Sequence, residues 1–295
     1  MKKVLVALMV LTISIAFAGT SFAAKKKGYA EGTAGAGLIA GVVSLKGAVP
    51  APIMEDLNKG KNVEFCTKHP DTVKDGFRPR VKVTAAGGKL KDAVVFIESI
   101  ATGKPWGELG KAHFDFKKCD VVQKVLAVRK PTKAEAKANA TKAEGGVMTV
   151  TNNDPEILHN PHGYSIKGAN RKTLFNKPLP SQGDVARVTK NIKRLKQKKD
   201  KHFFLQCDQH NFMEADARIV WNPYYSISGA DGAFKIDGIP AGKYKVTAWH
   251  PYTGDEASQE VTVGAGAAKA NFTLKARKLK ASPPPDKCPL GNQVG

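Results

Sequence analysis

The stretch NPYYSISGADGAFKIDGIPAGKYKVTAWHPYTGDEASQEVTV, residues 222–263, decides the fold class of the C-terminal part of the chain. Apolar and polar residues alternate in it, as they do in strands that bury one face of a sheet. Glycine, proline and aspartate recur at short intervals between the alternating segments and mark turns. The pattern predicts about six short strands that form a small β-sandwich.

The sequence before Trp221 also predicts strands broken by turns. RVKVTAAGGKLKDAVVFIESI, residues 80–100, is typical of a hairpin with its turn at Gly87-Gly88. VMTVTNND and HFFLQ, residues 147–154 and 202–206, are two further candidate strands. The whole chain is therefore expected to be all-β.

The N-terminal residues 1–23, MKKVLVALMVLTISIAFAGTSFA, are typical of a bacterial secretory signal. Two lysines precede a short apolar run, and small residues end it. The alternative is a membrane anchor, but the run is short and no second hydrophobic span follows. We expect cleavage after Ala23 and a periplasmic or extracellular protein, in a compartment where disulfides persist.

The charge balance is strongly basic. The chain has 47 Lys and Arg against 26 Asp and Glu, a net charge of +21, which becomes +19 when Lys2 and Lys3 leave with the signal. Such an excess indicates an acidic protein, an anionic cell-surface polymer or nucleic acid as partner, and export makes nucleic acid the weakest of these. A generally basic, soluble surface is the simpler alternative.

Changes in composition divide the mature chain. We expect a linker, a first domain with a basic, Ala-rich insertion that lacks an apolar face, a second domain, and a disordered basic and proline-rich tail. Their ranges are 24–40, 41–221 with the insertion near 131–145, 222–275, and 276–295.

RVTKNIKRLKQKKDKH, residues 187–202, concentrates positive charge just before Cys207. A run of like charges is usually a solvated loop or hairpin tip, and a docking patch for an acidic partner is the alternative. Both interpretations stay open at this point.

The segment LQCDQHNFME, residues 205–214, places three metal-binding side chains at even spacing: Cys207, His210 and Met213. A thiolate, an imidazole and a thioether together favour copper over magnesium, calcium or manganese, and a blue-copper site needs one more imidazole. His159 lies in VTNNDPEILHNPHGY, residues 150–164, where a strand is expected to end. His162 is the competing histidine, and chance packing of the three side chains is the alternative to a metal site.

These motifs match a known family. CDQHNFM resembles the short ligand loop of the cupredoxins, and NNDPEILHN resembles the strand end that carries their first ligand histidine. Residues 41–275, apart from the insertion, resemble exported plastocyanin-like proteins in which a cupredoxin precedes a carboxypeptidase-regulatory-like domain. The resemblance implies a Greek-key cupredoxin β-sandwich followed by a small prealbumin-like β-sandwich.

The resemblance also implies roles for individual residues. The copper ligands would be His159, Cys207, His210 and Met213, with the ring edge of His210 facing solvent as the electron port. Asn160 would latch the two ligand loops, and Cys66 would form a disulfide with Cys119. Asn211 and Phe212, with basic sequence upstream, depart from the family's apolar docking face. The pairing of Cys288 stays open.

The function that the sequence predicts is a type 1 copper protein that carries single electrons. Four protein ligands leave no open metal position for a substrate, and no serine–histidine–acid order, paired-carboxylate signature or Gly-rich phosphate loop indicates an enzyme. An acidic redox protein such as a c-type cytochrome is the expected partner, with an anionic cell-surface polymer as another. The alternatives are a copper carrier or scavenger, and a cell-surface binding module that holds no metal.

Overall fold

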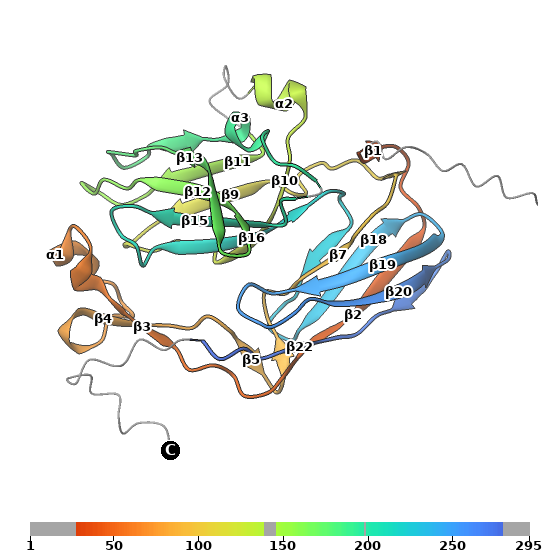
Figure 1. Ribbon diagram of the computed structural model, residues 1–295, viewed down its shortest axis with the longest axis horizontal. Helices are drawn as coiled ribbons and strands as arrows, with labels where there is room; N and C mark the ends of the chain where they lie inside the picture. The colour runs from red at the N-terminus through yellow and green to blue at the C-terminus, as the bar shows by residue number, and fades with distance from the viewer. Residues whose placement is uncertain (1–27, 139–145, 198, 280–295) are drawn as a thin grey trace, which may run out of the picture.

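The computed structural model describes residues 28–138, 146–197 and 199–279. These residues form mainly strands, with a few short helices, so the predicted all-β fold class is confirmed. The strands build two β-sandwiches, which Figure 1 shows next to each other. None of the helices in the described ranges is long and apolar enough to cross a membrane.

The first sandwich consists of eight strands: β9 (Ala112–Phe116), β10 (Val125–Arg129), β11 (Met148–Asn152), β12 (Pro161–Lys167), β13 (Asn170–Asn176), β14 (Val185–Arg187), β15 (His202–Cys207) and β16 (Glu214–Val220). One sheet has the order β10-β16-β15-β12-β13 and the other the order β14-β11-β9. Aromatic side chains fill the space between the sheets. Phe114 and Phe203 are both fully buried, with ring centroids 6.0 Å apart.

The second sandwich contains ten strands: β2 (Gly37–Lys46), β5 (Ala85–Ala86), β6 (Lys89–Leu90), β7 (Val94–Ile97), β17 (Tyr225–Ile227), β18 (Ala233–Ile239), β19 (Gly242–Trp249), β20 (Ala257–Val263), β21 (Ala267–Lys269) and β22 (Phe272–Lys275). Its sheets have the orders β17-β7-β19-β20 and β18-β2-β6-β5, with β21 and β22 also paired to β2. The predicted turn is confirmed, because Gly87 and Gly88 join β5 to β6 with φ of +54° and +73°.

The strand pairings correct the expected division of the chain. The sequence analysis assigned residues 41–221 to the first domain, but β2 and β7 pair with strands that follow residue 222. The expected linker 24–40 is also too long, since β2 already begins at Gly37. The physical reason is that β2 supplies the central strand on which β18, β21 and β22 assemble, a long-range pairing that local sequence patterns do not show.

A segment between β2 and β5 folds over one end of the first sandwich and is called the cap here. It comprises β3 (Ile53–Asp56), the 3-10 turn η1 (Leu57–Lys59), α1 (Val63–Cys66), η2 (Lys74–Gly76) and β4 (Phe77–Arg80). Figure 1 shows α1, β3 and β4 at the end of the first sandwich. The remaining elements are β1 (Ala30–Glu31), β8 (Thr102–Gly103), α2 (Lys133–Ala138) and α3 (Thr189–Ile192).

The basic stretch 187–202 is more than a solvated loop. It contains α3 and the start of β15, and its apolar residues Val188, Ile192 and Leu195 are fully buried in the first sandwich. Their spacing of four and three residues places them on one face, with the lysines on the other. The insertion near 131–145 likewise begins with α2, in which Ala136 is 3% exposed, and its residues 139–145 lie outside the described ranges.

Three other predictions fall wholly or mostly outside the described residues. The expected signal, residues 1–23, and Cys288 are not covered by the structure. The expected tail, residues 276–295, is described only to residue 279, and the backbone N–H of Ala276 donates to the carbonyl of Lys46 at 2.8 Å. The first residue of the tail is therefore attached to the end of β2.

Candidate metal centre

The pairing of β12 with β15 brings the two candidate ligand segments together. Pro161, the first residue of β12, lies opposite Cys207, the last residue of β15. His159 precedes Pro161 by two residues, and His210 follows Cys207 by three. An antiparallel pair with this register places the loop before β12 and the loop after β15 at the same end of the sandwich, as the sequence analysis expected.

Three of the four predicted ligands form a compact cluster. Sγ of Cys207 lies 3.7 Å from Nδ1 of His159 and 3.6 Å from Nδ1 of His210. The two Nδ1 atoms are 3.2 Å apart. All three side chains are fully buried, although they come from loops about fifty residues apart in the chain.

The outer nitrogens of the two histidines decide which ring atoms carry hydrogen. Nε2 of His159 lies 2.9 Å from Oδ2 of Asp154, and Nε2 of His210 lies 3.0 Å from the carbonyl oxygen of Lys61. Carbonyl and carboxylate oxygens accept, so both Nε2 atoms donate. In the neutral rings, the two Nδ1 atoms then face each other and Cys207 with free lone pairs.

This arrangement fits a metal ion better than it fits a hydrogen-bonded core. Two acceptor nitrogens 3.2 Å apart repel each other unless a proton or a cation lies between them. Ligands bound at about 2.0 Å (nitrogen) and 2.3 Å (sulfur), with tetrahedral to trigonal angles, lie about 3.3–3.5 Å (N to N) and 3.5–3.7 Å (N to S) apart. The observed separations are close to these values, so the donor set fits a single metal ion.

Burial keeps the protons off His210 and on Cys207. Burial is the main cause that lowers the pKa of His210 to about 4, and the nearby His159 is the second. Burial raises the pKa of the Cys207 thiol, although backbone N–H groups that include that of Asn160 act in the opposite direction. At neutral pH His210 is therefore a neutral imidazole and Cys207 is a thiol. A metal ion would displace the proton of this thiol.

Main-chain hydrogen bonds close the loop that carries Cys207, His210 and Met213. The N–H of His210 donates to the carbonyl of Cys207 at 3.2 Å, and that of Met213 donates to the carbonyl of His210 at 2.8 Å. The N–H of Cys207 donates in turn to the carbonyl of Met213 at 3.0 Å. Met213 is fully buried in the same core cluster as Cys207. The loop thus keeps the predicted axial residue in the interior of the first sandwich.

Asn160 joins the two ligand loops through its backbone. Its N–H donates to Sγ of Cys207 at 3.3 Å, and its carbonyl accepts from the N–H of Asp208 at 3.0 Å. The side-chain Oδ1 atom is buried without a hydrogen-bond partner. The expected latch between the loops is therefore present between these residues, and the main chain provides it.

His162 does not belong to the cluster. It stacks on Tyr164 with ring centroids 4.1 Å apart, and its Nδ1 lies 3.1 Å from Oδ2 of Asp208. It points into a polar group at the surface of β12 and β13 that includes Asn176 and Thr173. Of the two competing histidines, the structure places His159 beside Cys207.

The expectation that the ring edge of His210 faces solvent is wrong. The side chain of His210 is fully buried, and the cap covers it. Its Nε2 is bonded to the carbonyl of Lys61, and a Cβ added at Gly60 would lie 3.2 Å from a ring carbon of His210. The element that the sequence analysis missed is the cap. Its residue Lys61 contacts His210 although the two are about 150 residues apart in sequence, and no local pattern around His210 indicates this contact.

The cap is attached by the disulfide that the resemblance implied. Cys66 of α1 and Cys119 of the β9–β10 loop form this bridge, and both are fully buried. In the described ranges Cys207 is the free cysteine, so the thiol of the cluster remains available. The oxidised pair therefore fixes α1 against the first sandwich next to the candidate metal centre.

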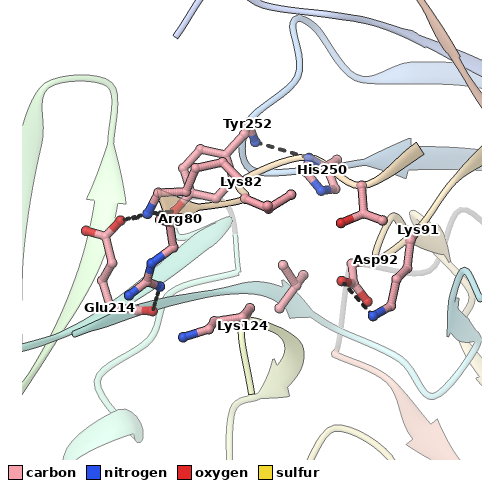
Figure 2. Close-up of a pocket in the computed structure, with 11 residues that line it drawn as sticks. Arg80, Lys82, Lys91, Asp92, Lys124, Glu214, His250 and Tyr252 are labelled. Carbon is pink, nitrogen blue, oxygen red and sulfur yellow. Dashed lines mark hydrogen bonds and ion pairs between the residues drawn. The ribbon is translucent and has the colours of Figure 1, made fainter. Parts of the chain in front are cut away.

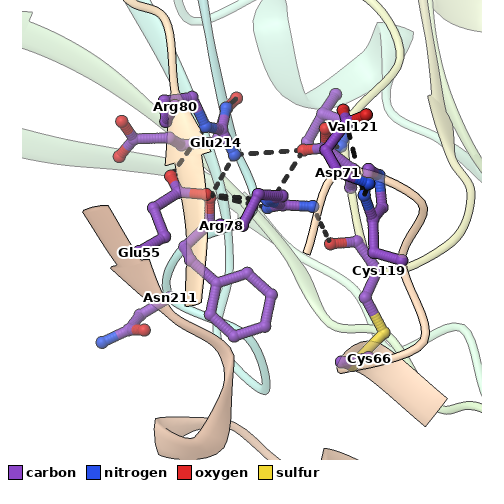
Figure 3. A network of polar contacts seen from close by, with 12 residues as sticks. Glu55, Cys66, Asp71, Arg78, Arg80, Cys119, Val121, Asn211 and Glu214 are labelled. Atoms are coloured by element: carbon purple, nitrogen blue, oxygen red, sulfur yellow. Dashed lines mark hydrogen bonds and ion pairs between the residues drawn. A yellow bond between two sulfur atoms is a disulfide. The ribbon is translucent and has the colours of Figure 1, made fainter. Parts of the chain in front are cut away.

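Sequence reasoning missed a buried ionic network between the cap and the first sandwich. Figure 3 shows Arg78 and Arg80 of β4 between Glu55 and the loop that carries Cys119. Nη2 of Arg78 lies 2.8 Å from Glu55 Oε2, and Nη2 of Arg80 lies 3.0 Å from Asp120 Oδ1. The available signal was in β4, where Arg78 and Arg80 alternate with Phe77 and Pro79, and Arg78 lies opposite Glu55 of β3.

A hollow lies between the two sandwiches, and Figure 2 shows its lining. Its volume is about 140 Å³, and its lining includes four cations, Arg80, Lys82, Lys91 and Lys124. Lys82 pairs with Glu214, and Lys91 lies 3.9 Å from Asp92. Because the acidic side chains already pair with these cations, we assign no ligand to this hollow.

Comparison with known proteins leaves the family open. No family model and no curated protein matches the chain. A solved structure of a copper-containing nitrite reductase from Thermus scotoductus SA-01 is similar, with 13% identity and a TM-score of 0.24 over 37% of this chain and 22% of that one. The match spans about a fifth of that protein, and a TM-score this low carries no argument. The metal-binding interpretation rests on the cluster itself.

Proposed function

We propose that this chain is an exported type 1 copper protein that carries single electrons between redox partners. The observation that carries the proposal is the buried cluster in which two acceptor nitrogens and a thiol face one another at metal-ligand separations. A thiolate with two imidazoles, and Met213 buried in the same loop, is a donor set that suits copper. The resemblance of both ligand segments to cupredoxins supports the same metal.

His159, Cys207, His210 and Met213 would hold the ion, and copper would supply the one-electron exchange. Asp154 and the Lys61 carbonyl orient the two rings, so the nitrogen positions are set before the metal arrives. A rigid donor set changes little between the two oxidation states of copper, which favours fast transfer.

The burial of the site supports a carrier over an enzyme. The side chains of the four proposed ligands are fully buried, so a substrate has no open approach to the ion. Electron exchange needs no such approach, because it requires only a short covalent and hydrogen-bonded route to the surface. The bond from His210 to the carbonyl of Lys61, whose side chain is exposed, provides that route.

The charges on the cap suit an acidic redox partner such as a c-type cytochrome. Lys59, Lys61 and Lys68 of the cap are exposed, and the carbonyl of Lys61 is the hydrogen-bond partner of His210. Positive charge at the surface where the electron leaves the protein attracts an acidic partner and fixes its orientation. A second basic face contains Arg171 and Lys172 of β13, and it suits an anionic cell-surface polymer.

Export to the periplasm or the extracellular space is part of the proposal. The Cys66–Cys119 disulfide supports it, because structural disulfides persist in oxidising compartments. The N-terminal sequence typical of a secretory signal supports it as well.

Copper transport or scavenging is the second candidate function. The complete cover over His210 favours it, because a carrier that only retains copper gains from a site closed to solvent. The two functions differ in what reduction does: an electron carrier keeps copper in both oxidation states, whereas a metal carrier releases it in one.

The experiment is voltammetry of the copper-loaded protein, followed by electron exchange with an acidic c-type cytochrome at increasing ionic strength. We expect a reversible one-electron wave and exchange that slows as salt rises. Lys61→Glu should slow the exchange strongly, whereas Lys235→Glu, at an exposed position of β18 in the second sandwich, should not. Release of copper to a chelator on reduction, without a reversible wave, would establish the metal-carrier function instead.

A further inference from the structure

A second cluster of soft donors lies beside the candidate metal centre. The sulfur atoms of Cys66 and Cys119 and a ring nitrogen of His210 all lie within 4.8 Å of one another, and all three residues are fully buried. His210 therefore belongs to two donor clusters, one with Cys207 and one with the disulfide.

The surrounding contacts hold these three residues together. The carbonyl oxygen of Lys61 accepts from Nε2 of His210 at 3.0 Å and lies 3.7 Å from Sγ of Cys66. The N–H of Cys119 donates to Oδ2 of Asp154 at 2.9 Å, and the same oxygen accepts from Nε2 of His159. The disulfide thus lies in contact with the residues that orient both histidines.

We propose that Cys66, Cys119 and His210 form a second metal site, specific for copper(I), when the disulfide is reduced. Two thiolates and an imidazole are the soft donors that copper(I) prefers, and breaking the disulfide would leave these three donors close to one another. Nη1 of Arg78 lies 3.4 Å from the carbonyl of Cys119, and its charge offsets the net negative charge of a two-thiolate copper(I) complex.

The redox step balances with a dithiol as the reductant. Reduction breaks the Cys66–Cys119 bond, consumes two electrons and two protons, and converts the dithiol to a disulfide. Binding of copper(I) then displaces the thiol protons to solvent, and the ring proton of His210 moves from Nε2 to Nδ1, which lies 3.2 Å from Nδ1 of His159, so that Nε2 can bind the ion. A protein disulfide donor reverses the step and closes the site. A newly exported chain, whose thiols are still reduced, therefore offers this site before its disulfide forms.

The test uses the double variant Cys207→Ser/Cys288→Ser, in which Cys66 and Cys119 are the remaining cysteines. The inner thiolate is absent, and the disulfide form measures any copper(I) that His159, His210 and Met213 still hold. The protein is prepared with its disulfide intact and after anaerobic reduction and removal of the dithiol. Both forms compete for copper(I) with a coloured chelator, and circular dichroism checks that both are folded.

The reduced form should take one equivalent of copper(I) more from the chelator than the disulfide form takes. Adding His210→Ala should weaken binding by about tenfold or more, since even a residue that only supports a ligand costs that much. Bound copper(I) should also protect both thiols from alkylation, measured by mass spectrometry. The proposal is overturned if the reduced form binds no better than the disulfide form, or if His210→Ala leaves the affinity unchanged.

Discussion

Nη2 of Arg80 donates a hydrogen bond of 2.6 Å to the main-chain carbonyl of Phe212, the residue before Met213. The same guanidinium lies 2.7 Å from Glu55 Oε1 and 3.0 Å from Asp120 Oδ1, and its side chain is 5% exposed. One buried cation of the cap therefore binds the loop that carries three of the proposed copper ligands. The cap stabilises the site as well as covering it.

Arg80→Met should destabilise the protein by about 3 kcal/mol, because it leaves buried carboxylates of Glu55 and Asp120 with one cation fewer. We expect the lower end of the usual range, since Arg78 still pairs with both. The free energy of unfolding from urea titration measures the effect. The matched control is Lys243→Met, whose exposed pair with Glu260 should contribute less than about 1 kcal/mol. Equal losses in the two variants would contradict a structural role for the network.

Asp154→Asn should weaken copper binding by about 10- to 100-fold, because the carboxylate that accepts from Nε2 of His159 orients that ring. Chelator competition measures the affinity. Asp200→Asn is the control, since Asp200 is also a buried acceptor but bonds to Ser165 and to the N–H of Lys196, away from the cluster. An unchanged affinity in Asp154→Asn, at equal folding, would show that His159 needs no such support.

Gly60→Ala should disturb the copper site directly. Its φ of −95° suits any residue, but the added Cβ would lie 3.0 Å from Phe212 and 3.2 Å from His210 ring carbons. We expect a shifted visible spectrum and a loss of about 1–2 kcal/mol in unfolding free energy from overpacking. Gly266→Ala, where a Cβ meets open space, should change neither. If both variants have the wild-type spectrum, the cap does not press on His210.

The site was more predictable from the sequence than the fold around it. Cys207, His210 and Met213 are neighbours in sequence, and the end of β15 brings them to one loop, so their grouping needed only local information. His159 required a strand pairing, which the turn residues after β11 indicated. The cover over His210 was not predictable, because its carbonyl partner, Lys61, is distant in sequence.

The predicted domain boundary was wrong for a related reason. The sequence of β2 shows an apolar strand, but nothing in it says that its partners lie some 190 residues later, in β18. In the basic stretch before β15, the high charge obscured the spacing of Val188, Ile192 and Leu195. The burial of these residues anchors α3 in the core. Long-range strand pairings and widely spaced apolar residues are not recognised from local sequence patterns.

His250→Asn should reduce the acid sensitivity of the metal-free protein. Burial lowers the pKa of His250 from 6.5 to about 4, so the unfolded chain binds more protons between these values and stability falls as the pH falls through them. Between about pH 7 and pH 4, the wild type should lose about 3 kcal/mol more than the variant. Asparagine keeps an acceptor for the N–H of Tyr252, which His250 Nδ1 now provides. Parallel pH profiles from urea titration would show that His250 does not titrate as a buried neutral ring.

The most direct test of the central claim is a titration of the metal-free protein with copper(II), followed by visible absorption and electron paramagnetic resonance. The account predicts an intense thiolate-to-copper band that saturates at one equivalent, with narrow hyperfine splitting. The band should vanish in Cys207→Ser and change or vanish in His159→Ala, and His162→Ala, outside the cluster, should retain it. A wild-type protein that stays colourless with copper, or a band that His159→Ala leaves unaltered, would contradict the claim.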